Sequence, residues 1–316
     1  MNFSRFQPLI DEVNGRINEI LIGRPENLYN ASKHIIIAGG KRIRPLICIL
    51  ACRAVGGDDR DVIETAAAIE LIHTFTLIHD DIMDEDEFRR GIKSVHEIYG
   101  HSTAILAGDL LFSNAFRICH RDVFKILADA SAMICEGQEM DISFEKRTDV
   151  KEDEYMEMIR KKTAVLLETA AKVGALLGNG DKEEVENLSS FGLNIGIAFQ
   201  IKDDILGVIA DEKKLGKPVG SDIYKCKKNL IAIKSLEFLK NDKRKKLLRI
   251  LSQRNNTKKE INDAIELFKE SGAIEYCTQM MNNYAEMARN SILNLKKSKA
   301  RDDLLDLSDF IIKREF

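Results

Sequence analysis

The sequence predicts an all-α fold, a single-domain helical bundle around a central apolar cavity. Only four prolines occur in 316 residues, so long stretches of the chain contain nothing that breaks a helix. Two segments, residues 61–84 and about 184–206, are apolar almost all round, which is typical of buried helices. The alternation of β-branched and polar residues that marks a strand is not evident in the sequence.

The first apolar segment has no glycine or proline and is rich in Ala, Leu and Ile, which predicts a central helix of about six turns. In the second segment Gly192 and Gly196 stand one turn apart, so we expect a neighbouring helix to pack closely there. Short polar or glycine-containing joints separate the other helical patterns, which cover residues 102–118, 122–141 and 151–177.

After about residue 230 the chain becomes more charged, with the runs KNDKRKK and QRNNTKKE between amphipathic stretches. We interpret these runs as solvated helix faces and turns rather than a basic interaction patch. Internal repeats, low-complexity segments and proline-rich linkers are not found in the sequence. The chain is therefore expected to form one domain, residues 1–316.

Composition narrows the class of protein. Apolar residues make up 44% and charged residues 31%, and the net charge of −3 gives no general attraction to nucleic acid, so no nucleic-acid partner is expected. The closest of six cysteines, Cys48 and Cys52, have helical spacing in an apolar run, which favours buried reduced thiols over a disulfide or metal framework. Because the N-terminus lacks a clean apolar stretch and no run approaches roughly 18 apolar residues, we expect a cytoplasmic protein without a transmembrane segment.

The sharpest chemical feature is the sequence DDIMD at the end of the first apolar segment. Asp80 and Asp84 are four residues apart and so share one helix face, with Asp81 beside them. Like charges repel, and the partial negative charge of a helix C-terminus adds to that cost. Divalent cations would relieve both, and carboxylate oxygens with room for water suit magnesium.

The second apolar segment ends in the same way, with Gln200 followed by Asp203 and Asp204. Either acidic group alone could be a solvated helix end. Two such groups on buried helices instead suggest acidic ends that face each other across one cavity and hold several metal ions around an anionic ligand.

Basic residues accompany the acidic groups. Residues 39–45, GGKRIRP, form a glycine-rich turn with three cations in which Pro45 suits the first position of a helix, and such a turn can bind a diphosphate. Further cations follow each acidic group or open a helical stretch: Arg89, Arg90, Lys162, Lys217 and Lys227. The pattern fits a site where acidic side chains bind one diphosphate through metal ions and basic side chains bind a second directly. Two diphosphate substrates and a buried apolar cavity point to prenyl chemistry.

At this point the chain resembles the trans-isoprenyl diphosphate synthases, from about residue 39 to about residue 228. The matching segments are GGKRIRP, ELIHTFTLIHDDIMDEDEFRRG, GQEMD, KKTAVL, FGLNIGIAFQIKDDIL and LGKPVGSD. The resemblance implies a bundle of the isoprenoid synthase type, a single polyprenyl synthase domain. It also implies a magnesium-dependent enzyme with three ions per site that joins an allylic diphosphate to isopentenyl diphosphate.

The resemblance also assigns roles by position. Metal ions would be bound by Asp80, Asp84 and Asp203, with Asp81, Asp141 and Asp204 in support. The allylic diphosphate would be held by Arg89, Lys162 and Lys217, and isopentenyl diphosphate by Lys41, Arg44, His73 and Arg90. Oxygen dipoles of Thr163 and Gln200 would face the developing cation, and Lys227 matches a lysine of the closing loop.

Three positions need separate mention. His73 lies on an apolar helix, where a histidine is usually a hydrogen-bonded core residue, and only the matched position gives it a substrate role. The second aspartate motif reads DDILG, so Gly207 replaces the usual third aspartate. Asn229 stands where the family commonly has threonine, and both departures could alter hydrogen bonds around the metal site.

Product length is predicted from the residues just before the first aspartate. Phe75 and Thr76 lie five and four positions before Asp80 and should line the upper wall of a tunnel for the growing tail. A bulky Phe75 beside a small Thr76 predicts an intermediate product, and the pattern resembles archaeal-type geranylgeranyl diphosphate synthases, which sometimes also make farnesyl diphosphate. The alternative is that Phe75 is ordinary core.

Other readings stay open at this level: a terpene cyclase, a longer-chain polyprenyl diphosphate synthase, or an inactive subunit of a hetero-oligomeric prenyltransferase. A cyclase does not need the second diphosphate site that GGKRIRP and Arg89-Arg90 provide, and inactive subunits commonly lose aspartates that this chain keeps. The family also leads us to expect a homodimer.

Overall fold

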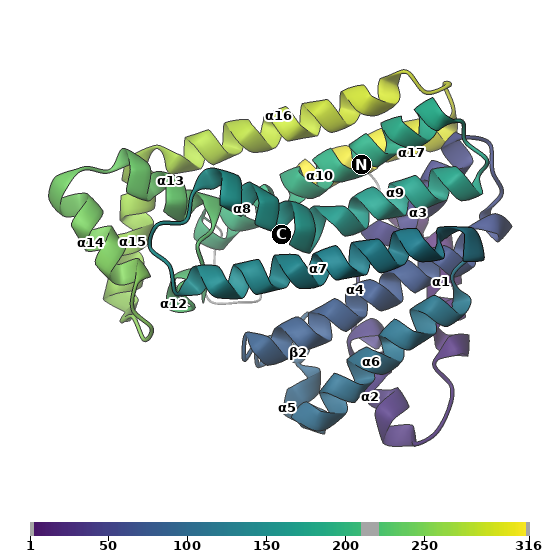
Figure 1. The fold of residues 1–316 in the computed structure, drawn as a ribbon, viewed down its shortest axis with the longest axis horizontal. Coiled ribbons are helices and arrows are strands. Elements are labelled where there is room, and N and C mark those ends of the chain that lie inside the picture. Colours follow the sequence, from purple (N-terminus) through teal and green to yellow (C-terminus); the bar gives the residue numbers. More distant parts are fainter. Residues whose placement is uncertain (1–2, 210–220, 314–316) are drawn as a thin grey trace. The chain divides into compact units, whose positions relative to one another are not determined.

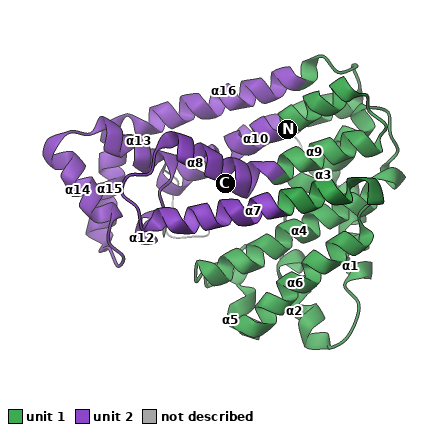
Figure 2. Ribbon diagram, in the orientation of Figure 1, with its two compact units in different colours: residues 1–131, 166–192, 292–306 green, residues 132–165, 193–291, 307–316 purple. Residues whose placement is uncertain are grey.

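The computed structural model describes residues 3–209 and 221–313, and it confirms the all-α fold (Figure 1). The chain divides into two compact units (Figure 2). Unit 1 contains residues 1–131, 166–192 and 292–306, and unit 2 contains residues 132–165, 193–291 and 307–316.

Unit 1 holds the first predicted central helix, α4 (Ile63–Met83), which packs against α6 (His101–Ile118). A Cβ atom on Gly108 of α6 would come within 2.2 Å of the imidazole of His79, so the missing side chain leaves room for that ring between the two helices. The other helices wholly in this unit are α1 (Gln7–Ile20), α2 (Glu26–Ile37), α3 (Ile43–Ala54) and α5 (Val95–Tyr99), with 3-10 turns η1 (Phe3–Phe6), η2 (Asp59–Asp61) and η3 (Arg121–Val123). Helix α9 (Val165–Leu177) also lies in this unit except for its first residue.

A two-stranded antiparallel hairpin, β1 (Phe88–Arg89) and β2 (Ile92–Lys93), follows α4 directly. The sequence pattern does not predict this hairpin, because two residues per strand are too few for an alternating pattern. Its turn residues Arg90 and Gly91 both have positive φ, 53° and 78°, as a tight hairpin turn requires. The hairpin fixes the direction of Arg89 and Arg90 relative to α4.

In unit 2 the predicted helical stretch 151–177 begins as α8 (Glu152–Ile159) and continues through a π-helical turn, η4 (Arg160–Ala164), before α9. The wider π turn carries Lys162 and Thr163, and such turns are frequent at functional sites. Other helices wholly in this unit are α12 (Ser221–Tyr224), α13 (Leu230–Phe238), α14 (Asn241–Leu251) and α15 (Lys258–Ser271); α7 (Phe124–Glu145), α10 (Lys182–Ile209), α16 (Ala273–Leu293) and α17 (Lys299–Lys313) contribute residues to both units.

The two glycines of α10 act as expected. A Cβ on Gly192 would lie 2.4 Å from the carbonyl oxygen of Leu167, and one on Gly196 would lie 2.7 Å from the Cα of Ala164. Only glycine at these positions allows the backbones to approach so closely. The prediction of close packing at both glycines is confirmed.

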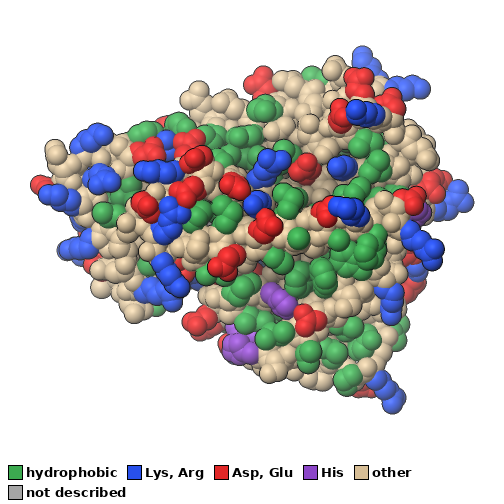
Figure 3. All heavy atoms as spheres, viewed as in Figure 1, with side chains coloured by type: hydrophobic (Ala, Val, Ile, Leu, Met, Phe, Trp, Pro, Cys, Tyr) green, Lys and Arg blue, Asp and Glu red, His purple; other side chains and the backbone are tan. Residues whose placement is uncertain are grey.

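The basic run in α14 is a solvated helix face, as predicted. Leu247 and Ile250 are buried on one side of the helix. On the other side Lys243 and Lys246 form ion pairs with carboxylates of α15, at 2.7 and 2.8 Å. Acidic and basic side chains are intermingled on the face shown in Figure 3. In the described part of the chain, no helix has the length and apolar character to cross a membrane.

Candidate active site

The first aspartate motif lies at the C-terminal end of α4, in unit 1. The helix ends at Met83, and the backbone N–H of Asp84 donates to the carbonyl of Asp80 at 2.8 Å, which closes the last turn. Asp80 and Asp84 therefore lie one turn apart at the negative end of the helix dipole, as predicted. That position favours a bound cation.

Asp81, the middle acid of the motif, has a different local role. Asp81 is fully buried, and its Oδ1 atom accepts hydrogen bonds from the guanidinium of Arg89, at 2.8 Å from Nε. The hairpin strand β1 brings Arg89 to this position. Asp81 thereby orients Arg89, the arginine expected at the allylic diphosphate, while its supporting role toward a metal ion stays a prediction.

His73 and Arg44 also lie together in unit 1, with 3.1 Å between His73 Nε2 and Arg44 Nη1. A guanidinium can only donate, so Nε2 of His73 is the acceptor and the ring proton belongs on Nδ1. Burial and the nearby guanidinium of Arg44 lower the pKa of His73 well below its ordinary value. The histidine is thus a neutral side chain in contact with an expected diphosphate ligand.

The three cations of the turn GGKRIRP, Lys41, Arg42 and Arg44, do not have equivalent surroundings. Helix α3 begins at Ile43, two residues before Pro45, so the proline lies at the third helical position instead of the first. Arg42 turns inward, and its side chain is 1% exposed in an ion pair with Glu70 of α4 at 3.0 Å. The Nη1 atom of Arg90 donates to the carbonyl oxygens of Ile35, at 3.1 Å, and of Gly39.

Unit 2 brings Asp141 together with two of the predicted lysines. The Oδ2 atom of Asp141 is 2.6 Å from Nζ of Lys162 and 2.9 Å from Nζ of Lys227. Burial opposes ionisation of Asp141, but the two ammonium groups outweigh it and lower the pKa of the carboxyl. Glu145, which was not predicted from the sequence, forms a further ion pair with Lys227 at 3.1 Å.

A glycine makes this arrangement possible. A Cβ on Gly137 of α7 would lie 2.3 Å from the backbone nitrogen of Lys162, so α7 touches the π turn there only because the side chain is absent. Asp141 follows one turn later on the same face of α7 and meets the ammonium of Lys162. The motif GQEMD therefore combines a contact glycine with the acid that orients the lysines.

A second hydrogen-bond chain in unit 2 starts at Thr163. Its hydroxyl donates to Oε1 of Gln200 at 2.9 Å, and Nε2 of Gln200 donates to Oδ1 of Asp204 at 3.0 Å. The hydroxyl of Tyr155 donates to Oδ2 of the same carboxylate. Burial raises the pKa of Asp204 to about 7, although these donors favour its charged form.

The structure explains both departures from the family pattern locally. Asn229 is the N-cap of α13, and its Oδ1 atom accepts from the backbone N–H of Ala232 at 3.0 Å, a role that asparagine fills as well as threonine. Asn229 also donates to Oδ2 of Asp222 at 3.3 Å. A Cβ on Gly207 would lie 3.6 Å from that same Oδ2, so a carboxylate already stands beside the position of the missing aspartate.

Phe75 takes part in an aromatic cluster of unit 1. Its ring lies 5.1 Å from that of Phe112 on α6 and 4.8 Å from the imidazole of His79, between ring centroids. Phe112 in turn contacts Phe116 at 4.9 Å. Thr76 donates its hydroxyl to the carbonyl of His73 at 2.8 Å. The chain-length role of Phe75 and Thr76 stays a prediction.

The predicted residues thus form local groups within each unit, and Lys217 lies outside the described residues. The expectation that the two acidic ends face each other across one cavity stays a prediction. Within the described ranges no group of three or more His, Cys, Asp or Glu side chains is placed to hold a metal ion. Magnesium commonly takes one or two carboxylates and completes its octahedron with water and substrate phosphate. The pair Asp80 and Asp84 fits that chemistry.

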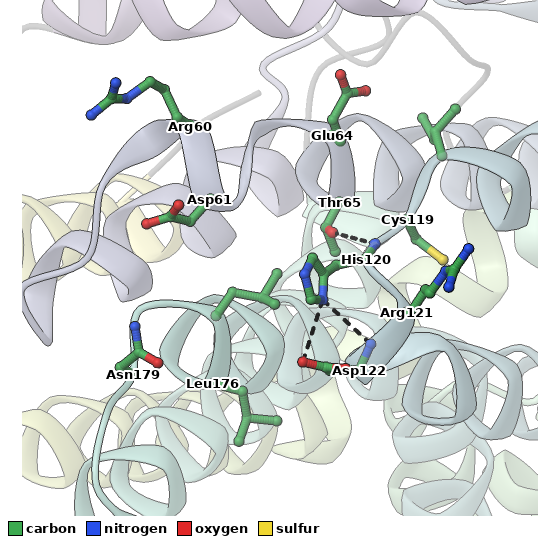
Figure 4. Close-up of a pocket in the computed structure, with 12 residues that line it drawn as sticks. Arg60, Asp61, Glu64, Thr65, Cys119, His120, Arg121, Asp122, Leu176 and Asn179 are labelled. Carbon is green, nitrogen blue, oxygen red and sulfur yellow. Dashed lines mark hydrogen bonds and ion pairs between the residues drawn. The ribbon is translucent and has the colours of Figure 1, made fainter.

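A separate pocket of about 780 Å³ in unit 1 lies at the other end of α4 (Figure 4). Thr65 and His120 line it, and the backbone N–H of His120 donates to Oγ1 of Thr65 at 3.1 Å. Its charged side chains are of both signs, among them Arg60, Glu64 and Asp122. Residues predicted for the active site do not line this pocket.

Two residues that shape these groups were not predicted from the sequence. Tyr155 is 1% exposed and holds Asp204, yet it stands in an ordinary amphipathic pattern with no local signal. Glu70 is 2% exposed, and an acid among the apolar residues in the middle of the segment 61–84 was a signal that a cation lies beside it.

The chain matches a known protein family. The model of the family described as polyprenyl synthetase matches residues 25–268. The chain is 48% identical over 299 residues to the short chain isoprenyl diphosphate synthase of Methanothermobacter thermautotrophicus, covering 92% of this chain and 91% of that protein.

Two solved structures are closely similar. Geranylgeranyl pyrophosphate synthetase from Pyrococcus horikoshii Ot3 is 45% identical with a TM-score of 0.94, covering 99% of this chain and 98% of that one. Polyprenyl synthase from Caulobacter crescentus CB15, solved with calcium and isoprenyl diphosphate, is 31% identical with a TM-score of 0.94, covering 99% and 97% of the two chains. From the family match and the identity across nearly the whole length, this chain belongs to the polyprenyl synthetase family.

Proposed function

We propose that this chain, a prenyltransferase, condenses an allylic diphosphate of five to fifteen carbons with isopentenyl diphosphate and gives mainly the C20 product, geranylgeranyl diphosphate. The observation that carries the proposal is the end of α4, where Asp80 and Asp84 stand in the same unit as the arginines of the hairpin and the Arg44–His73 pair. An acidic group for metal-bound diphosphate and a cationic group for a second diphosphate match a two-diphosphate reaction.

In the proposed reaction the allylic C–O bond breaks, and diphosphate leaves with the bonding electrons. The terminal double bond of isopentenyl diphosphate attacks the allylic cation, a C–C bond forms, and a proton is lost from the adjacent carbon to give the new double bond. Three magnesium ions, bound by Asp80, Asp84 and Asp203 with Asp81, Asp141 and Asp204 in support, would supply positive charge for the leaving diphosphate.

Different basic side chains bind the two diphosphates. Arg89, oriented by Asp81, acts with Lys162 and Lys217 on the allylic diphosphate. Lys162 is oriented by Asp141, and so is Lys227, which acts from the closing loop. Such charge-assisted contacts hold an anion in one orientation.

Isopentenyl diphosphate is held by Lys41, Arg44, His73 and Arg90. Because Nε2 of His73 accepts from Arg44, its Nδ1–H is the atom that can donate to an oxygen of the diphosphate. Thr163 donates its proton to Gln200, so the lone pairs of its oxygen are available to face the allylic cation.

The C20 product is supported by Phe75 and by the similarity to a geranylgeranyl pyrophosphate synthetase. We further propose that residues 1–316 act as one polyprenyl synthase domain, since the family model spans residues of both units. A cytoplasmic homodimer completes the proposal, and analytical ultracentrifugation of the purified protein would check the dimer.

The function is tested by incubating purified protein with magnesium, labelled isopentenyl diphosphate and each of the C5, C10 and C15 allylic diphosphates. Products are dephosphorylated and resolved by length. A C20 product that disappears with a chelator and returns with added magnesium is the expected result. Condensation to a longer product would keep the reaction and overturn the chain length, and no condensation with any primer would overturn the function.

A further inference from the structure

We propose that Arg42 and Glu70 are positioning residues that hold the turn GGKRIRP in the shape that binds the non-allylic diphosphate. The inference rests on the proposed function, which gives Lys41, Arg44 and Arg90 to that substrate. Arg42 stands between Lys41 and Arg44 in the same turn, so its sequence position alone would make it a third diphosphate ligand. The structure assigns it a different task.

Arg42 is directed into unit 1 and away from any ligand of the turn. Its side chain is 1% exposed, and that of Glu70 is 2% exposed. Its Nη1 atom donates to Oε1 of Glu70 at 3.0 Å, and its Nε atom donates to Oδ1 of Asn14 at 2.8 Å. With its side chain 1% exposed and its Nε, Nη1 and Nη2 atoms all donating inside the unit, Arg42 is not presented to a substrate phosphate.

The other donors of Arg42 hold the turn itself. Nη2 donates to the carbonyl of Ile36 at 2.8 Å, the last turn of α2, and Nη1 lies 3.4 Å from the carbonyl of Gly39. One planar guanidinium therefore connects α1, α4, the end of α2 and the turn, and its fixed fork of donors sets their relative position. Lysine has no comparable fork.

The backbone of the turn is in a conformation that needs such support. Arg42 has φ 48° and ψ 40°, the left-handed region, which an arginine adopts only when its surroundings impose it. Gly39 and Gly40 precede it with φ 96° and 153°. The turn thus contains three residues of positive φ, and contacts of the Arg42 side chain hold it.

The expected substrate ligands depend on this arrangement. Arg90 also donates to the carbonyl of Gly39, so Arg42 and Arg90 share one acceptor. A Cβ on Gly40 would lie 2.7 Å from Nη1 of Arg42 and 2.9 Å from Nη1 of Arg90, so both guanidinium groups pack on the bare backbone of Gly40. Loss of the Arg42–Glu70 pair would therefore displace Arg90 as well as Lys41.

The deciding experiment compares R42Q, R42K, E70Q and the double variant R42Q/E70Q in steady-state kinetics with each substrate varied. We expect KM for isopentenyl diphosphate to rise about tenfold in each single variant, with KM for the allylic diphosphate changed less than about threefold. R42K, which keeps the charge without the fork, should resemble R42Q. In the double variant KM for isopentenyl diphosphate should rise no further than in either single variant, because the two residues act as one unit.

The opposite role predicts an opposite sign. If Arg42 binds the diphosphate directly, E70Q would free the charge of Arg42 for the substrate, so KM for isopentenyl diphosphate would stay unchanged or fall. In that case R42K, which keeps the charge, would retain most of the affinity for isopentenyl diphosphate. That result would overturn the proposal. So would a rise of both KM values by the same factor, because a general loss of structure does not distinguish the two substrates.

A matched control is Arg301→Gln. Arg301 is also a largely buried arginine in unit 1 that reaches backbone carbonyls, those of Leu293 and Leu295, but it does not touch the turn. We expect R301Q to lower Tm without changing the ratio of the two KM values. Where R42Q does not fold, N14A removes only the 2.8 Å acceptor of Nε and should raise KM for isopentenyl diphosphate by a smaller factor, about threefold.

A measurement without turnover separates this inference from the proposed function. Hydrogen exchange of the backbone amides of residues 39–44 should be faster in E70Q and R42K than in the native protein and in R301Q. Faster exchange in a protein that shows no condensation would retain the clamp and reject the function. Unchanged exchange would reject the clamp, whatever the activity.

Discussion

The hydroxyl of Tyr155 on α8 donates a hydrogen bond to the carboxylate of Asp204 on α10, and both side chains are buried. Asp204 in turn accepts from Gln200, whose other amide atom accepts from Thr163. Asp204 therefore acts locally to orient a glutamine and a threonine, in addition to its proposed support of metal binding. Tyr155 belongs to the same hydrogen-bonded group, although it lies 49 residues away in sequence.

Removal of this hydroxyl in Y155F should lower kcat about tenfold, because Asp204, the partner of Gln200, is then held less firmly, with smaller changes in KM for either substrate. The loss of a buried hydrogen bond should also lower the free energy of unfolding by about 1–3 kcal/mol. Kinetics and urea unfolding measure the two effects. Y276F is the control, since Tyr276 also donates to a carboxylate, Glu152 at 2.9 Å, within unit 2. Equal losses of kcat in both variants would contradict the role of Tyr155.

His73 should make stability depend on pH. Its pKa in the folded protein lies well below that of the unfolded chain, about 6.5. The unfolded chain therefore binds a proton that the folded protein does not, and the free energy of unfolding should fall as pH drops below about 6.5. Above that pH the contribution is fully present. H73Q, which can still accept from Arg44, should show a shallower fall between about pH 6.5 and 5. Urea unfolding across this range measures the difference, and identical slopes would contradict the prediction.

Restoring the family aspartate in G207D should not improve the enzyme. The new carboxylate would start from a Cβ that lies 3.6 Å from Oδ2 of Asp222, and two carboxylates that close repel each other. We expect a lower Tm and unchanged or lower kcat. The double variant G207D/D222N should recover Tm, because the repulsion is removed. Higher activity in G207D with no loss of Tm would show that Asp222 does not oppose an acid there.

Shortening Phe75 should lengthen the product. F75A removes a ring that packs 5.1 Å from Phe112, and we expect products longer than C20 in the assay described above. F112A should shift the product in the same direction, because Phe112 holds the ring of Phe75 in place. F238A is the control, since that ring contacts Tyr276 in unit 2 at 5.8 Å. An unchanged product in F75A would leave Phe75 as ordinary core.

Much of the fold could be predicted because its signals are local. The central helix predicted over residues 61–84 is α4, Ile63–Met83, and the one predicted over 184–206 is α10, Lys182–Ile209. The hairpin after α4 was missed because two-residue strands have no periodicity, although Gly91 marked its turn. The π turn at Arg160–Ala164 was missed because nothing in the sequence separates it from ordinary helix.

The sequence by itself determined that the chain is helical, where the two acidic groups stand, and that Asp80 and Asp84 share a helix face. Each of these three properties depends on residues within one or two helical turns of each other, and their spacing can be read directly from the sequence. Family membership also follows from such spacings.

The tertiary structure alone decided which charges are available and which are internal. Arg42 and Arg44 are two residues apart in one motif, yet Arg42 is a buried clamp because Asn14 and Glu70, each 28 residues away in sequence, lie beside its guanidinium. Tyr155 reaches Asp204, and Lys162 and Lys227 converge on Asp141, for the same reason. Burial and long-range pairing set the role of an ionisable side chain, and neither property is encoded in its neighbours along the chain.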